Sequence, residues 1–150
     1  MSSSPLGTHH VVQIGIIVRD LEESTKAWSQ LLGVPAPQIM ITDPVEISRA
    51  KYGGQLTSAL AKLAFIPLGQ VTLELIEPIG EPSTWNDQLV QHGQSLHHVA
   101  FEIKGMADKL AVLKDHGLSL IQHGEYPGGR YSYLDGQEKY GAILELLEND

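Results

Sequence analysis

Two glutamates stand in matching positions near the ends of two similar apolar runs, and they are the first candidates for chemistry in this chain. Glu74 and Glu145 each lie between two leucines. Because side chains alternate along a β-strand, each carboxylate would face away from its leucine neighbours. A buried lone charge is strongly unfavourable, so two such carboxylates pointing into one cavity need a shared partner.

Two further polar side chains, Gln13 and His98, open apolar runs of the same pattern. Residues 13–18 and 98–103 both follow the order polar, branched, small, apolar, any, branched. Two carboxylates in contact raise each other's pKa unless a cation lies between them, and a proton is the competing cation. One imidazole, two carboxylates and one amide oxygen suit Co²⁺, Ni²⁺, Mn²⁺, Fe²⁺ or Zn²⁺. The sequence therefore predicts a divalent-metal site made by Gln13, Glu74, His98 and Glu145.

The elements that must position these residues occur twice in the order strand, helix, strand, strand, strand. In the first unit, Asp20 predicts the start of a helix and Gly33 its end. Periodicity and turn residues predict the remaining boundaries. The first unit has strands at 11–18, 39–42, 60–67 and 71–77 and a helix at 21–32; the second has strands at 96–103, 118–122, 130–134 and 142–147 and a helix at 107–116.

This arrangement predicts one α+β domain over residues 9–150 after a flexible N-terminus, residues 1–8. The first βαβββ module covers about 9–78 and the second about 96–148. Between them, 79–95 is predicted to be a linker with a short amphipathic segment. Residues 43–57 are polar and contain glycine, which predicts a long loop or a partly helical excursion.

Composition narrows the function classes. The chain has 150 residues, no cysteine and a formal net charge of −8. The lack of cysteine excludes disulfides and thiolate metal sites, and the acidic balance argues against nucleic acid as a partner. No apolar run is long enough to span a bilayer, and residues 1–7 lack the plan of a signal peptide. We therefore predict a cytoplasmic protein with a small-molecule ligand and no membrane partner.

Three segments resemble the vicinal oxygen chelate superfamily, and most closely its methylmalonyl-CoA epimerase branch: residues 11–23, 73–80 and 95–103. The superfamily includes glyoxalase I, extradiol dioxygenases and bleomycin-resistance proteins, and the resemblance covers roughly residues 9–148. It implies that the paired modules form an open, cupped mixed sheet around a metal held by Glu74, His98 and Glu145. It also implies Glu145 as a catalytic base, and a homodimer.

The chain departs from the epimerase pattern at two positions. Gln13 stands where epimerases usually have a His ligand, and His10 is the reserve candidate although it is out of phase on a strand. The second catalytic base of an epimerase aligns with Ser58. These departures leave the second base without an assigned residue.

The predicted function is metal-assisted proton transfer next to a carbonyl, giving epimerisation or isomerisation. Glu145 is the first choice of base and Glu74 the alternative. A glyoxalase I-like lyase would use much the same site, whereas an extradiol dioxygenase would need a second His in register. A non-catalytic module that sequesters a small molecule, as bleomycin-resistance proteins do, is the alternative of another class. A carbonyl compound or thioester, including a CoA thioester, is the expected substrate.

Several other residues have a structural and a functional interpretation. Lys62 either extends from a sheet edge or faces the cavity. Arg130, Tyr131 and Tyr133 either line the mouth of the site or belong to a surface turn. The remaining residues are given structural interpretations: His97 is predicted to face away from His98, Glu77 and Glu148 to end strands in solvent, and Tyr52 and Trp85 to pack or anchor loops.

Overall fold

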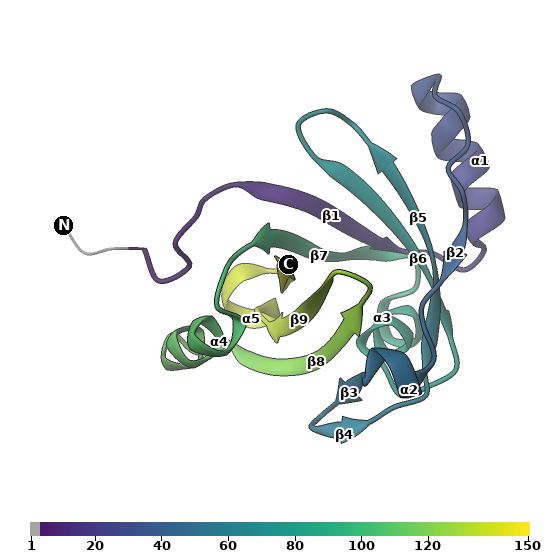
Figure 1. The fold of residues 1–150 in the computed structure, drawn as a ribbon. Helices are drawn as coiled ribbons and strands as arrows, with labels where there is room; N and C mark the ends of the chain where they lie inside the picture. Colours follow the sequence, from purple (N-terminus) through teal and green to yellow (C-terminus); the bar gives the residue numbers. More distant parts are fainter. Residues whose placement is uncertain (1–3) are drawn as a thin grey trace.

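The chain forms one strongly curled mixed β-sheet, and two of its helices pack against the outer face of this sheet (Figure 1). The computed structural model describes residues 4–150. Within them the strands are β1 (Val11–Ile17), β2 (Met40–Ile41), β3 (Lys51–Tyr52), β4 (Gln55–Leu56), β5 (Leu60–Pro67), β6 (Thr72–Ile79), β7 (Ser95–Glu102), β8 (Ser119–Tyr126), β9 (Gly129–Asp135) and β10 (Ile143–Asn149). The helices are α1 (Leu21–Leu32), α2 (Val45–Ser48), α3 (Thr84–His92), α4 (Met106–Asp115) and α5 (Gln137–Tyr140).

The strand order is β2-β5-β6-β1-β7-β10-β9-β8-β3-β4. The first and last long strands of each half pair in parallel, β1 with β6 and β7 with β10. The two halves join where β1 and β7 run antiparallel. The predicted open, cupped mixed sheet is therefore confirmed, and its centre is the set of four strands that carry the candidate ligands.

The apolar faces of the two halves pack against their own helices. In the first half, Leu73 and Leu75 are buried in a cluster with Leu21 of α1. In the second half, Leu146 is buried with Met106 and Leu113 of α4. Because side chains alternate on a strand, these leucines send their neighbours Glu74 and Glu145 to the concave face, as predicted.

Glu77 and Glu148 were predicted to end strands in solvent, and that prediction was wrong. Glu77 Oε1 accepts a hydrogen bond of 2.8 Å from the backbone N–H of Leu21 at the start of α1. Glu148 accepts hydrogen bonds from the backbone N–H groups of Gly105 (2.7 Å) and Met106 (3.2 Å) at the start of α4. A helix N-terminus has unpaired N–H groups and a positive dipole end, which a carboxylate satisfies. Each half thus fastens its helix to its own last long strand.

The segment 43–57 is partly helical, as one of the predicted alternatives had it, and it crosses from one edge of the sheet to the other. It leaves β2, forms α2, and adds β3 beside β8 of the second half, with Lys51 opposite His123. Tyr52 then donates a hydrogen bond from its hydroxyl to Asp87 of α3. This crossing places the segment along the open side of the curled sheet (Figure 1).

Most predicted boundaries agree with the structure within two residues, including those of α1 and β5. One predicted strand was too short, because β8 continues to Tyr126, and the short helix α5 between β9 and β10 was not predicted. None of the helices in residues 4–150 is long and apolar enough to span a membrane. Of the predicted flexible N-terminus, residues 1–3 lie outside the described residues.

Candidate metal centre

The four predicted ligands come together on the concave face of four adjacent strands. Glu74 lies on β6, Gln13 on β1, His98 on β7 and Glu145 on β10. Glu74, His98 and Glu145 are each at most 6% exposed, and one ligand atom from each lies within 4.8 Å of the other two. The positions that repeat in the sequence therefore lie together on one face of the sheet.

The spacing of the ligand atoms fits a divalent ion. His98 Nε2 lies 3.3 Å from Glu74 Oε1 and 3.1 Å from Glu145 Oε1. Gln13 Oε1 lies 3.1 Å from His98 Nε2. Adjacent ligands on a metal with bonds of about 2.1 Å are separated by about 3.0 Å in octahedral and about 3.4 Å in tetrahedral geometry. The donor set and its spacing thus suit the N- and O-preferring divalent ions named above.

The Gln13 amide serves two arrangements of the cluster. With its nitrogen turned inward, Gln13 donates hydrogen bonds to Glu74 Oε1 (3.2 Å) and Glu145 Oε1 (2.9 Å). With its oxygen turned inward, the same side chain offers the donor atom that a cation requires. A rotation of the amide by half a turn therefore exchanges a hydrogen-bonding role for a ligand role.

When no metal is present, a proton on His98 offsets part of the negative charge of the two carboxylates. Burial lowers the pKa of His98, but the adjacent carboxylates of Glu145 and Glu74 outweigh it and raise that pKa to about 10. Burial raises the pKa of Glu74, and contact with His98 opposes the change. An imidazolium between two carboxylates is the proton alternative that the sequence left open.

His97 does not face away from His98, and that prediction was wrong. It is only 1% exposed. The pairing of β7 with β1 shifts between Gly15 opposite His98 and Ile16 opposite Leu96, so His97 is an extra residue in a β-bulge. A bulge breaks the alternation of side chains, which allows two consecutive residues to share a side of the sheet.

The bulge connects the cluster to a second layer of hydrogen bonds. His97 Nδ1 lies 2.8 Å from His98 Nδ1, and His97 Nε2 lies 3.1 Å from Thr84 Oγ1. Burial, followed by the charge of His98, holds the pKa of His97 well below its ordinary value, so His97 is neutral. His98 Nδ1–H then donates a hydrogen bond to His97 Nδ1, and His97 Nε2–H donates one to Thr84 Oγ1. This arrangement leaves His98 Nε2 free to bind a cation.

Gly15 provides the space for the His98 ring. It lies opposite Glu74 on one side and His98 on the other. A Cβ at this position would lie 2.1 Å from Cε1 and 2.4 Å from Nδ1 of the ring. The small residue in the repeated sequence pattern is therefore a requirement of the site.

A cavity of about 580 Å³ opens beside the cluster, and Gln13, Glu74 and Glu145 form part of its wall. Tyr131 and Tyr133 also line it, as one of the two interpretations predicted. Their hydroxyl oxygens accept hydrogen bonds from Gln122 Nε2 and Trp85 Nε1, each of 3.0 Å. Burial raises the pKa of both tyrosines, so both hydroxyls stay protonated.

Several other predicted residues lie outside this cavity. Lys62 forms ion pairs with Glu22 (3.5 Å) and Glu77 (3.8 Å), and Arg130 pairs with Glu148 (3.0 Å) and Asp150. Neither lines the cavity, so of their two interpretations the structure favours the surface one.

His10 and Ser58, the two residues considered for the missing roles, also do not line the cavity. His10 precedes β1 and is exposed, although β1 does contain an irregularity in its pairing after Val11. Ser58 is exposed and does not line the cavity. Trp85, predicted to pack or to anchor a loop, is buried and forms part of the cavity wall.

The sequence matches the Glyoxalase/Bleomycin resistance protein/Dioxygenase superfamily over residues 12–133. The chain belongs to this superfamily. Among curated proteins, the uncharacterized protein YqjC of Bacillus subtilis (strain 168) is 28% identical over 140 residues, which cover 90% of this chain and 89% of YqjC.

Solved structures of the superfamily's fold are similar over nearly the whole chain. The hypothetical protein BH1468 from Bacillus halodurans C-125 gives a TM-score of 0.65 at 20% identity, covering 93% of this chain and 94% of that one. Methylmalonyl-CoA epimerase from Mycobacterium tuberculosis gives 0.62 at 16% identity, covering 100% and 93%. These likenesses confirm the predicted fold.

Proposed function

We propose that the protein is a metal-dependent enzyme that moves a proton next to a carbonyl group, as an epimerase or isomerase does. The observation that carries the proposal is the buried cluster of Glu74, His98 and Glu145 at the wall of a cavity. Two buried carboxylates and an imidazole are unfavourable without a cation, and their spacing suits one. Membership of the superfamily and the structural likeness to an epimerase support the same conclusion.

In this proposal Gln13, Glu74, His98 and Glu145 hold a divalent ion, which supplies positive charge that acidifies the C–H bond beside a bound carbonyl. Glu145 takes and returns the proton, and Glu74 is the alternative base. The apolar wall of the cavity excludes water, which strengthens the electrostatic interactions inside it. The protonated hydroxyls of Tyr131 and Tyr133 orient substrate oxygen atoms by donating hydrogen bonds.

Ser58, which aligns with the second base of an epimerase, does not supply that base inside the cavity. Epimerisation by two bases needs a proton acceptor on each face of the substrate, and Ser58 is exposed outside the cavity. A single carboxylate is enough for isomerisation or for a glyoxalase I-like lyase, in which the proton is removed and returned by one group. The lyase is therefore the second candidate for the same site.

Metal content tests the proposal against the sequestering alternative. Wild type and His98→Ala are stripped, reloaded with Co²⁺, Ni²⁺, Mn²⁺ or Zn²⁺, and measured by plasma mass spectrometry, with His123→Ala as the matched control. His123 is a half-buried histidine on β8 outside the cluster. Wild type and the control should bind about one ion per chain, and His98→Ala should lose it.

If the metal binds, exchange of deuterium into α-carbonyl compounds is measured next by NMR. Glu145→Gln should abolish exchange while the protein stays folded. A wild type that binds no divalent ion contradicts the proposal and leaves a binding module as the better account. The predicted homodimer and cytoplasmic location remain proposals, and light scattering on the purified protein tests the first.

A further inference from the structure

The cavity beside the metal centre has an unusual balance of charge. Its lining includes four carboxylates, Asp43 and Glu125 in addition to Glu74 and Glu145. Among the described residues that line it, none is a lysine, an arginine or a histidine. A divalent ion would neutralise the two ligand carboxylates, and the remaining two would still give the cavity a negative field.

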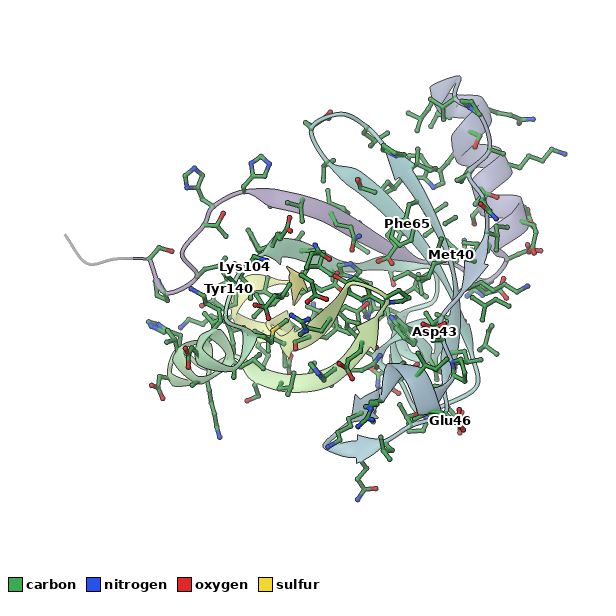
Figure 2. The ribbon with its side chains drawn as sticks, viewed as in Figure 1. Met40, Asp43, Glu46, Phe65, Lys104 and Tyr140 are labelled. Atoms are coloured by element: carbon green, nitrogen blue, oxygen red, sulfur yellow. The ribbon has the colours of Figure 1, made fainter. Side chains whose placement is uncertain are left out.

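Most of the remaining lining is apolar or aromatic, and it also includes four uncharged polar residues, Gln13, Thr42, Ser48 and Asn149. Met40, Leu63 and Phe65 line the cavity from the first half of the sheet, and Tyr126 and Pro127 line it from the second half. Figure 2 shows Met40, Asp43 and Phe65 on the side of the curled sheet formed by β2 and β5. A cavity of about 580 Å³ with such walls suits the body of a small hydrophobic molecule.

Two cations that were candidates for the cavity, Lys62 and Arg130, are paired elsewhere, and the exposed Arg49 and Lys51 of the crossing segment do not line it. Lys62 is paired with Glu22 and Glu77, on the side of the sheet that faces α1. Arg130 is paired with Glu148 and Asp150 at the C-terminus. A ligand carboxylate or phosphate is normally held by the guanidinium or ammonium group of such residues. Breaking these pairs would be needed before either cation could serve an anionic ligand.

From this charge balance we infer that the substrate is a small, uncharged carbonyl compound with a hydrophobic body, rather than an acyl-CoA thioester. This inference rests on the proposed function, because it names the substrate of the same site. The phosphates of a CoA ester would approach a mouth that carries Asp43 and Glu125, and facing like charges across an interface is strongly unfavourable. The aromatic walls, by contrast, favour an apolar ring.

Three probes separate the two classes of ligand. α-Hydroxyacetophenone is neutral, 4-(hydroxyacetyl)benzoate adds one remote carboxylate to the same skeleton, and propionyl-CoA carries the full set of phosphates. Binding is measured by calorimetry on Co²⁺-loaded protein and by quenching of tryptophan fluorescence on metal-free protein, since Trp85 lines the cavity. The neutral probe should bind at least about tenfold more tightly than its carboxylate analogue.

Charge variants test whether the acidic residues cause this preference. Asp43→Asn and Glu125→Gln should each improve binding of the carboxylate probe and leave binding of the neutral probe unchanged. Glu46→Gln is the matched control, because Glu46 is exposed on α2 and does not line the cavity (Figure 2). The control should leave the ratio of the two affinities as it is in wild type.

The outcomes distinguish this inference from the proposed function. If wild type binds metal but prefers the carboxylate probe or propionyl-CoA, the substrate class is wrong and the function stands. Failure of the neutral probe to bind at millimolar concentration also overturns the substrate class. If no metal binds but the neutral probe is still preferred on metal-free protein, the enzyme proposal fails and the ligand class stands.

Discussion

The contact between His97 and His98 predicts that two similar substitutions will have different effects on metal binding. An asparagine at position 97 places its side-chain oxygen near the position of Nδ1, so it still accepts a hydrogen bond from His98 Nδ1, which is 2.8 Å from Nδ1 of His97. A glutamine places its amide near the position of Nε2 and keeps only the contact with Thr84, which is 3.1 Å away. His97→Gln therefore loses the group that fixes the tautomer of His98.

Loss of such an outer partner weakens metal binding by roughly 10- to 100-fold, which corresponds to about 1.4–2.7 kcal/mol. Competitive titration with Co²⁺ should show this loss for His97→Gln and an affinity close to wild type for His97→Asn.

The stability of the two variants provides the control. Without metal, His97→Asn loses a neutral hydrogen bond worth about 1 kcal/mol, and His97→Gln loses one to the protonated His98 worth about 1.5–3 kcal/mol. Urea unfolding measures both losses and should show that both variants remain folded, so their Co²⁺ affinities compare two folded proteins. Equal Co²⁺ affinities for His97→Asn and His97→Gln, or wild-type affinity in both, would refute the role given to His97.

Three further predictions concern the cluster itself. Metal-free protein should lose stability by about 1.4 kcal/mol per pH unit between about pH 7 and about pH 10. The reason is that His98 keeps its proton up to a pKa of about 10 in the folded protein, whereas the unfolded chain releases it near 6.5. Urea unfolding at several pH values should show this slope, and His98→Gln should remove it. Gly15→Ala should displace the His98 ring and abolish Co²⁺ binding. The double variant with His98→Ala should be as stable as His98→Ala alone, because the clash is then removed. A further loss of stability in the double variant would mean that the alanine disturbs β1 in some other way. Gln13→His should raise the affinity for Ni²⁺, since an imidazole replaces a weak amide ligand; calorimetry that shows weaker binding would place Gln13 outside the ligand set.

The positions of Glu74 and Glu145 could be predicted from sequence because they depend on the simple alternation of strands within apolar surroundings. The inward side chain of His97 could not, since the extra residue of a β-bulge has no marker in a run of apolar residues. Glu77 and Glu148 were misjudged for a related reason. Their partners are helix termini more than 40 residues away in the chain, and only the folded arrangement brings them together.

The path of residues 43–57 could not be predicted either. Its polar composition indicates a loop, but nothing in it specifies that β3 pairs with a strand of the other half. Long-range pairing of this kind depends on which edge of the sheet is open, which is a property of the complete fold.

The crossing segment, residues 43–57, lines the cavity but carries none of the predicted metal ligands. Asp43, Ser48 and Ala50 of the crossing line the cavity, whereas the four cluster residues lie on central strands. Substitutions in the crossing can therefore alter ligand preference without disturbing the proposed chemistry. Exchange of this segment for that of a relative should therefore change the preferred ligand while the cluster on the central strands stays unchanged, and it offers a practical starting point for redesign.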